Sequence, residues 1–340
     1  MSVNRGNEIV FGDRDYVSES EIPEHGLLEI TALRRKMENG TTSLTIMAVN
    51  KTVDRPRGIN CIFQPELRID SANNDFVFEK YAGAVNFDVL DEEEQSLELQ
   101  YRNKHVYGTG LGTAVNWDID AKGSGYIRND FFPECEVPSM DFTLPKNSGV
   151  SDKTLSMKYL SDLDETDRNE KINDLTKLVD AYSAWIDDLF ARSHSLNPRF
   201  MKAAEKNLKG CREACERKRN GIGILREDGR AWDAFQLANR AMFMQRVQLA
   251  VQREYPATFP DERELSDVLK NIDYVTADTA FPKDRYAWRP FQLAFMLLDV
   301  VSVTDDSSAD RSMVDLIWFP TGGGKTEAYL GLTAMTIFYR

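Results

Sequence analysis

The chain has 340 residues, of which 42% are apolar, and its formal net charge is −13. This length and composition allow two or three domains with ordinary hydrophobic cores, which argues against a disordered chain. The acidic balance argues against a protein that coats nucleic acid over its whole surface, although it is compatible with a local basic channel.

The sequence contains no recognisable targeting signal. Residues 1–15 are polar and charged and lack the apolar segment of a signal peptide. No later stretch approaches the roughly 18 uncharged apolar residues of a membrane span. The four cysteines are too few and too scattered for a disulfide scaffold in a chain of this length. We therefore expect a cytoplasmic protein with reduced thiols.

Residues 1–150 are predicted to form a β-rich N-terminal module. Residues 28–33 and 44–49 are strand candidates on either side of Asn39-Gly40, which is a strong signal for a hairpin turn. Asn, Gly, Asp and Pro residues separate the other extended candidates, so the module resembles a β-sandwich. These candidates are residues 60–63, 66–69, 75–78, 96–101, 112–119 and 125–132.

Residues 151–280 are predicted to form a helical domain, because apolar residues here recur at helical spacing. The second of three helices is basic and is expected to end at Asn220-Gly221, and the third is expected to end before Pro256. The predicted helices cover residues 167–194, 198–219 and 230–254.

Residues 281–340 are expected to begin a RecA-like α/β domain. Residues 313–319 are an apolar run of strand length, as expected for a parallel strand that is buried on both faces. Residues 325–339 are expected to form the next helix, and strand, glycine-rich loop and helix are the context of a phosphate-binding loop. The predicted fold class is therefore α+β, with a β-sandwich-like module, a helical segment and the start of a RecA-like domain.

The glycine-rich loop carries the strongest functional signal. Three glycines allow the backbone N–H groups to point at a phosphate, and the helix that follows adds its positive dipole end. Lys325 would contact the β- and γ-phosphates of ATP, and the Thr326 hydroxyl would bind the Mg²⁺ that accompanies it, so these two are the catalytic candidates. The predicted Walker A loop consists of Pro320, Thr321, Gly322, Gly323, Gly324, Lys325 and Thr326.

The general Walker A pattern has a glycine where this chain has Phe319, so the match is incomplete. The loop resembles motif I of superfamily 2 helicases, in which a Thr-Gly-x-Gly-Lys-Thr core follows a small residue and proline. Phe319 departs from that pattern too. The alternative is a glycine-rich turn that binds nothing.

A second motif lies upstream of the loop. In superfamily 2 helicases a glutamine at such a distance recognises adenine, and Arg289, Pro290, Phe291 and Gln292 resemble this Q motif. An amide can pair with the N6 and N7 edge of adenine, and Trp288 or Phe291 could stack on the base. We therefore predict that Arg289, Phe291 and Gln292 contact the nucleotide, with a surface glutamine as the alternative.

The second predicted helix carries a candidate nucleic-acid contact. Lys202, Lys206 and Lys209 share one helical face and could follow a phosphate backbone. The favoured alternative is a solvated face, on which Glu205 pairs with Lys209 and Glu213 pairs with Arg217. On the same helix, Cys211 and Cys215 have the spacing of two metal ligands, but no third ligand is nearby, and we assign no metal site.

Four segments together carry a resemblance to a family. They are residues 219–222, 233–242, 288–295 and 318–329, of which the last two are the most specific. With a looser match in the β-rich part, they resemble the DrmA family, the helicase-like subunits of the DISARM anti-phage system. The resemblance covers the whole chain but only the front part of the family's length. It implies a bacterial defence ATPase that binds DNA together with a DrmB-like partner subunit carrying a DUF1998 domain.

Motifs needed for turnover are expected beyond Arg340. The Asp-Glu pair that would hold Mg²⁺ and activate water, and a second lobe with arginine fingers, are not among these 340 residues. We therefore expect ATP hydrolysis, and helicase or translocase action on phage DNA, only from the intact protein. Two alternatives stay open: a P-loop ATPase of another lineage, and an interaction platform that binds nucleotide without turnover.

Overall fold

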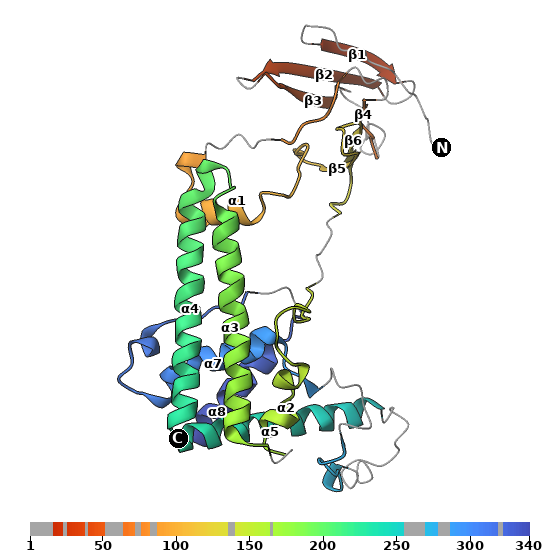
Figure 1. Ribbon diagram of the computed structural model, residues 1–340. Coiled ribbons are helices and arrows are strands. Elements are labelled where there is room, and N and C mark those ends of the chain that lie inside the picture. The colour runs from red at the N-terminus through yellow and green to blue at the C-terminus, as the bar shows by residue number, and fades with distance from the viewer. Residues whose placement is uncertain are drawn as a thin grey trace, which may run out of the picture. The chain divides into compact units, whose positions relative to one another are not determined.

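The computed structural model (Figure 1) divides into two compact units. The N-terminal unit contains residues up to Asn86 together with Tyr101–Val137, and the helical unit contains Phe87–Gln100 and Pro138–Arg340. The structure describes residues 16–22, 26–37, 40–51, 64–71, 76–81, 87–134, 140–163, 166–254, 269–277, 286–318 and 322–340.

The first sheet of the N-terminal unit is antiparallel and has the strand order β1-β2-β3. It consists of β1 (Tyr16–Ile22), β2 (Gly26–Lys36) and β3 (Thr42–Asn50). Pairing of β2 with β3 ends at Lys36 and Thr42, which confirms the predicted hairpin. Gly40 has a φ of +84°, a backbone conformation that favours glycine, whereas Asn39 lies outside the described residues. The sequence did not predict β1.

The second sheet is also antiparallel and has the order β4-β6-β5. Its strands are β4 (Arg68–Asp70), β5 (Ala114–Ile119) and β6 (Gly125–Asp130), which confirm three of the predicted segments. Ile69 and Trp117 both lie opposite Ile127, so these apolar side chains share one face of the sheet. The presence of both small antiparallel sheets and long helices confirms the α+β class, and the packing of one sheet on the other as a sandwich stays a prediction.

The strand predicted at residues 96–101 is wrong, because most of this segment belongs to helix α1 (Glu92–Gln100) of the helical unit. Asp91 caps the helix, since its carboxylate accepts hydrogen bonds from the backbone N–H groups of Glu93 and Glu94, both at 2.9 Å. Residues 76–78 are not in a strand, and residues 60–63 and 75, which were also predicted as extended, lie outside the described residues.

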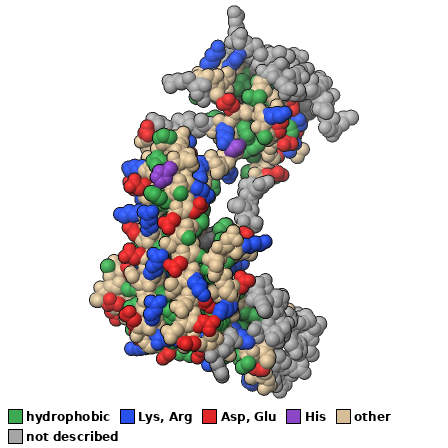
Figure 2. Space-filling model, viewed as in Figure 1, with side chains coloured by type: hydrophobic (Ala, Val, Ile, Leu, Met, Phe, Trp, Pro, Cys, Tyr) green, Lys and Arg blue, Asp and Glu red, His purple; other side chains and the backbone are tan. Residues whose placement is uncertain are grey.

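The helical unit contains the long helices, and the three predicted ones are present. Lys, Arg, Asp and Glu side chains are mixed on the face of this unit that Figure 2 shows. No helix in the described part of the chain has both the length and the apolarity needed to cross a membrane. The principal helices are α2 (Met157–Leu160), α3 (Arg168–Ser193), α4 (Met201–Glu227), α5 (Gly229–Glu254), α7 (Pro290–Thr304) and α8 (Lys325–Tyr339). Short 3₁₀ turns occur at Phe87–Val89, Asp152–Leu155, Pro198–Phe200 and Ala309–Ser312.

The predicted end of the second helix at Asn220-Gly221 is wrong, because α4 continues to Glu227. A Cβ atom on Gly221 would overlap the backbone oxygen of Leu297 and lie 3.2 Å from the Cβ of Val300, both on α7. The glycine therefore allows α4 and α7 to approach backbone to backbone, which explains why a residue with poor helix propensity stands inside the helix.

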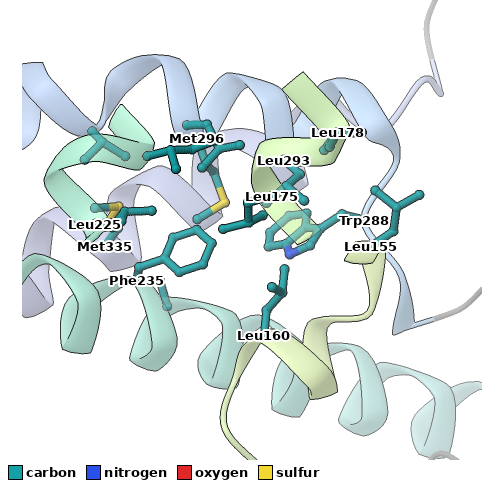
Figure 3. Packing of buried hydrophobic residues seen from close by; sticks show 14 of the residues in the cluster. Leu155, Leu160, Leu175, Leu178, Leu225, Phe235, Trp288, Leu293, Met296 and Met335 are labelled. Carbon is teal, nitrogen blue, oxygen red and sulfur yellow. The ribbon is translucent and has the colours of Figure 1, made fainter. Parts of the chain in front are cut away.

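Trp288 lies at the centre of the core, with 1% of its surface exposed (Figure 3). Its indole N–H donates to Oδ1 of Asn239 on α5 at 2.7 Å, and its backbone N–H donates to the oxygen of Leu155 at 2.7 Å. A Cβ on Gly331 of α8 would lie 2.7 Å from the Trp288 ring and 2.8 Å from the sulfur of Met296. Helix α8 therefore packs directly on Trp288 and α7.

The buried strand predicted at residues 313–319 is not present: residues 313–318 are in no strand, and Phe319 lies outside the described residues. Val314, Leu316 and Trp318 are 95%, 81% and 68% exposed, while Asp315 and Ile317 are half-buried. This alternation is strand-like, but burial on both faces needs neighbouring strands and flanking helices, and no strand in the described residues pairs with this segment. The start of a RecA-like domain stays a prediction.

Replacing Gly221 with alanine should lower the free energy of unfolding by about 1–3 kcal/mol, because the added methyl group collides with the backbone of α7. A Cβ added to Gly223 on the same helix would have no atom within 4 Å, so Gly223→Ala should instead stabilise by about 0.5–1 kcal/mol. Urea unfolding of both variants measures this. Equal effects of the two substitutions would contradict the close contact of α4 with α7.

Candidate nucleotide-binding site

Two glycines in the described part of the loop adopt a left-handed backbone conformation. Gly322 and Gly324 have φ values of +83° and +81°, in the left-handed region that favours glycine. Gly324 is also the N-cap of α8, so the first unpaired N–H groups of the helix follow the loop directly. Pro320 and Thr321 of the predicted loop lie outside the described residues.

The first turn of α8 presents the predicted catalytic candidates. Lys325 is half-buried and Thr326 is exposed at the start of the helix. Glu327 follows, and its Oε1 lies 3.4 Å from Nη1 of Arg246 on α5. The sequence did not indicate Arg246, which stands 81 positions away from Glu327 in the middle of a helix and in no local motif.

Gln292 joins the upstream motif to the loop, as their spacing had suggested. The side chain is 3% exposed. Its Oε1 accepts a hydrogen bond from the backbone N–H of Arg289 at 2.7 Å, and its Nε2 donates to the oxygen of Gly324 at 2.6 Å. The amide therefore both caps the N-terminus of α7 and holds the end of the loop. Because both of its polar atoms have protein partners, recognition of adenine by Gln292 stays a prediction.

Arg289 and Phe291 lie beside the loop as well. The Nη1 of Arg289 donates to the oxygen of Gly322 at 3.4 Å, and its guanidinium lies 4.1 Å from the ring centre of Phe142. The Phe142 and Phe291 rings are 5.6 Å apart. Phe142 was not predicted, because nothing in its own segment indicates a site. The suggested stacking of Trp288 on a base is wrong, since its ring is buried in the core.

The predicted nucleic-acid lysines are exposed but have carboxylate partners. The Nζ of Lys206 lies 2.6 Å from Glu92 on α1, Lys202 lies 3.8 Å from the same residue, and Lys209 lies 3.7 Å from Glu213. The hydrogen bond from Lys206 lowers the pKa of Glu92. This is the favoured solvated face, although with different partners: neither Glu205–Lys209 nor Glu213–Arg217 forms the expected pair.

The two cysteines of this helix do not form part of a metal centre in the described structure. Cys215 is buried and Cys211 is partly buried. In the part of the chain that the structure describes, no three His, Cys, Asp or Glu side chains are placed to hold a metal ion together.

A cluster of charged residues lies where the segment that leads to the loop meets α4 and α7. Arg217 of α4 is 11% exposed and forms two hydrogen bonds with Asp315, at 2.7 and 2.8 Å. Its Nε lies 3.3 Å from Asp310, and its Nη2 lies 3.6 Å from Asp299 of α7. We call these four residues the Arg217 cluster. Its three carboxylates outnumber its single guanidinium, so one of them is poorly compensated.

Asp299 is the poorly compensated member. Burial, together with the neighbouring carboxylate of Asp315, raises the pKa of Asp299 to about 7. Its Oδ2 is buried without a hydrogen-bond partner in the described structure. The hydrogen bonds from Arg217 instead lower the pKa of Asp315. The pKa values of the two carboxyl groups are therefore shifted in opposite directions, upward for Asp299 and downward for Asp315.

Among known proteins, no family model matches the chain. The chain is 33% identical to the DISARM protein DrmA of Bacillus paralicheniformis, over 96% of its own length and 28% of that protein. The chain is thus similar to this DrmA over nearly its whole length. This confirms the resemblance seen in the four sequence segments. Because the chain spans only 28% of the length of this DrmA, the activity, substrates and partners of the whole protein are proposals.

Replacing Asp299 with asparagine should stabilise the protein at pH 8 and have little effect near pH 4. The pKa of Asp299 is raised from its ordinary value of about 3.9 to about 7. The contribution of this carboxyl group to the free energy of unfolding is therefore fully present below about pH 4 and is lost as the pH rises through about 7. The neutral amide removes this loss, which should be roughly 2–4 kcal/mol at pH 8. Urea unfolding across this pH range measures it, and a constant difference between Asp299→Asn and the parent would contradict a buried proton on Asp299.

Proposed function

We propose that the chain is the ATP-binding front part of a DNA helicase or translocase that acts in anti-phage defence. The observation that carries the ATP-binding part of this proposal is the 2.6 Å hydrogen bond from Gln292 to the oxygen of Gly324. It joins the glycine loop to the upstream motif that was identified from its distance to the loop, 32 positions away. The relationship to a DISARM protein supports the biological setting.

The residues at the loop fit ATP and its Mg²⁺. A Cβ on Gly324 would lie 2.7 Å from the Gln292 amide nitrogen, so only glycine leaves this turn unobstructed. The backbone from Gly322 to Gly324 would hold phosphate oxygens, and Lys325 would neutralise their charge. Thr326 would bind the Mg²⁺ of the nucleotide, which in such sites neutralises the charge on the phosphates.

Arg289 and Gln292 would act mainly by holding the loop backbone in place. They donate to the carbonyl oxygens of Gly322 and Gly324, which fixes the loop without using the N–H groups that a phosphate needs. Phe291, beside Phe142, adds an aromatic surface next to Arg289, on which a base can pack.

DNA and a DrmB-like subunit with a DUF1998 domain are the partners that we propose. Lys202, Lys206 and Lys209 are exposed enough to contact a phosphate backbone. A bound strand would have to displace Glu92 and Glu213 from these lysines, so any contact here would be weak and salt-dependent.

A second candidate is a P-loop protein that is not a helicase, either an ATPase of another lineage or a platform that binds nucleotide without turnover. The engagement of both amide atoms of Gln292 within the protein favours this candidate, because a helicase of the expected type would use that amide for adenine.

The full-length protein should hydrolyse ATP faster in the presence of DNA, and Lys325→Ala should lower the stimulated rate by on the order of 100-fold, because the lysine charge faces the phosphates. Lys146, an exposed lysine of the same unit, provides a matched control, and Lys146→Ala should leave the rate unchanged. A phosphate-release assay with and without DNA measures this. An equal rate of ATP hydrolysis with and without DNA would favour an ATPase of another lineage. Absence of hydrolysis would favour the platform that binds nucleotide without turnover.

A further inference from the structure

The contact between Arg217 and Asp315 links the segment that leads to the glycine loop with α4. The two hydrogen bonds, at 2.7 and 2.8 Å, are a bidentate pair between a planar guanidinium and a carboxylate. Such pairs fix direction as well as distance, and they are stronger than the exposed single contacts made elsewhere on α4. Asp315 is thereby held in one position relative to the helix.

Asp315 is the polar member of the inward side of residues 313–318. Its neighbours Val314 and Leu316 are exposed, so the opposite side of this segment has few contacts that could fix it. Asp315 stands seven positions before Gly322, the first described residue of the loop. A residue that holds Asp315 therefore fixes residues 313–318, from which the chain continues toward the loop.

Arg217 is itself held on a rigid support. Helix α4 packs backbone to backbone on α7 at Gly221, one helical turn away from Arg217. Helix α7 begins with Arg289 and Gln292, which hold Gly322 and Gly324 at the loop. The entry to the loop and the loop itself are thus fixed to the same pair of helices, through Arg217 in the first case and through Gln292 in the second.

Lysine cannot replace the guanidinium in this cluster without loss. Three carboxylates surround the side chain: Nε of Arg217 faces Asp310, Nη1 faces Asp315, and Nη2 faces both Asp315 and Asp299. A lysine would keep the charge but would lose the two parallel hydrogen bonds to Asp315. Replacing Arg217 with lysine therefore tests the geometry of the contact with Asp315 while the positive charge is kept.

We propose that Arg217 is a positioning residue for the phosphate loop. Through Asp315 it holds residues 313–318, the entry segment, in the place that nucleotide binding requires. The inference rests on the proposed function, because it assumes that the loop binds ATP.

Titration of the full-length protein with a fluorescent ATP analogue and Mg²⁺ tests the proposal. Arg217→Lys and Asp315→Asn should each raise the Kd for the analogue by about five-fold or more. Both should also speed hydrogen exchange across residues 313–318. Arg219, on the same helix, forms an exposed pair with Asp180 at 3.2 Å, and Arg219→Lys should change neither quantity.

A Kd within about two-fold of the parent in both variants would overturn the proposal, even if hydrogen exchange rises, because Arg217 would then have a structural role only. Failure of the proposed function gives a different result. In that case the parent itself would not bind the analogue, or Lys325→Ala would bind it as well as the parent. The positioning role would then be wrong as well. The hydrogen-exchange rates would still report whether Arg217 holds residues 313–318.

Discussion

The burial of Trp288 is the constraint on which the rest of the helical unit depends. Its indole N–H is bonded to Asn239 of α5, and its backbone N–H is bonded to the oxygen of Leu155. Only a glycine fits opposite it on α8, at position 331. Because this contact fixes α8, it also fixes the start of that helix, where Lys325 and Thr326 lie. The packing of Trp288 on α8 therefore also positions the helix that follows the glycine loop.

The loop is held by two kinds of interaction that differ in their physical demands. Gln292 and Arg289 donate hydrogen bonds to backbone carbonyl oxygens. The desolvation free energy of these acceptors is small, because a neutral carbonyl needs few partners. The Arg217 cluster instead places three carboxylates around one guanidinium in a partly buried position. That arrangement is directional but leaves Asp299 poorly compensated, so the same cluster that orders the entry segment also makes stability sensitive to pH.

Local sequence patterns predicted the helices and strands that are determined by residues close together in the chain. The period of apolar residues predicted α3 and α5, and the Asn39-Gly40 turn predicted the pairing of β2 with β3. The failures all depended on distant residues or on competing local signals. Gly221 looked like a helix stop because its partner helix, α7, lies far along the chain. Residues 96–101 alternate like a strand, but the capping by Asp91 starts a helix before them.

For the site, the sequence predicted that Gln292 belongs with the loop, because both motifs carry their own chemical pattern. It missed Phe142, Arg246 and the partners of Arg217, since each reaches the site through the packing of helices rather than through a motif. The strand at residues 313–319 was predicted from apolarity alone, and apolarity does not supply the neighbouring strands that burial requires.

The most direct test of this account is an experimental structure of the full-length protein with Mg²⁺ and a non-hydrolysable ATP analogue. The account predicts phosphates at the N–H groups from Gly322 to Lys325, with Mg²⁺ at Thr326 and Gln292 still beside Gly324. A nucleotide bound elsewhere, or a loop without nucleotide at saturating concentration, would contradict it.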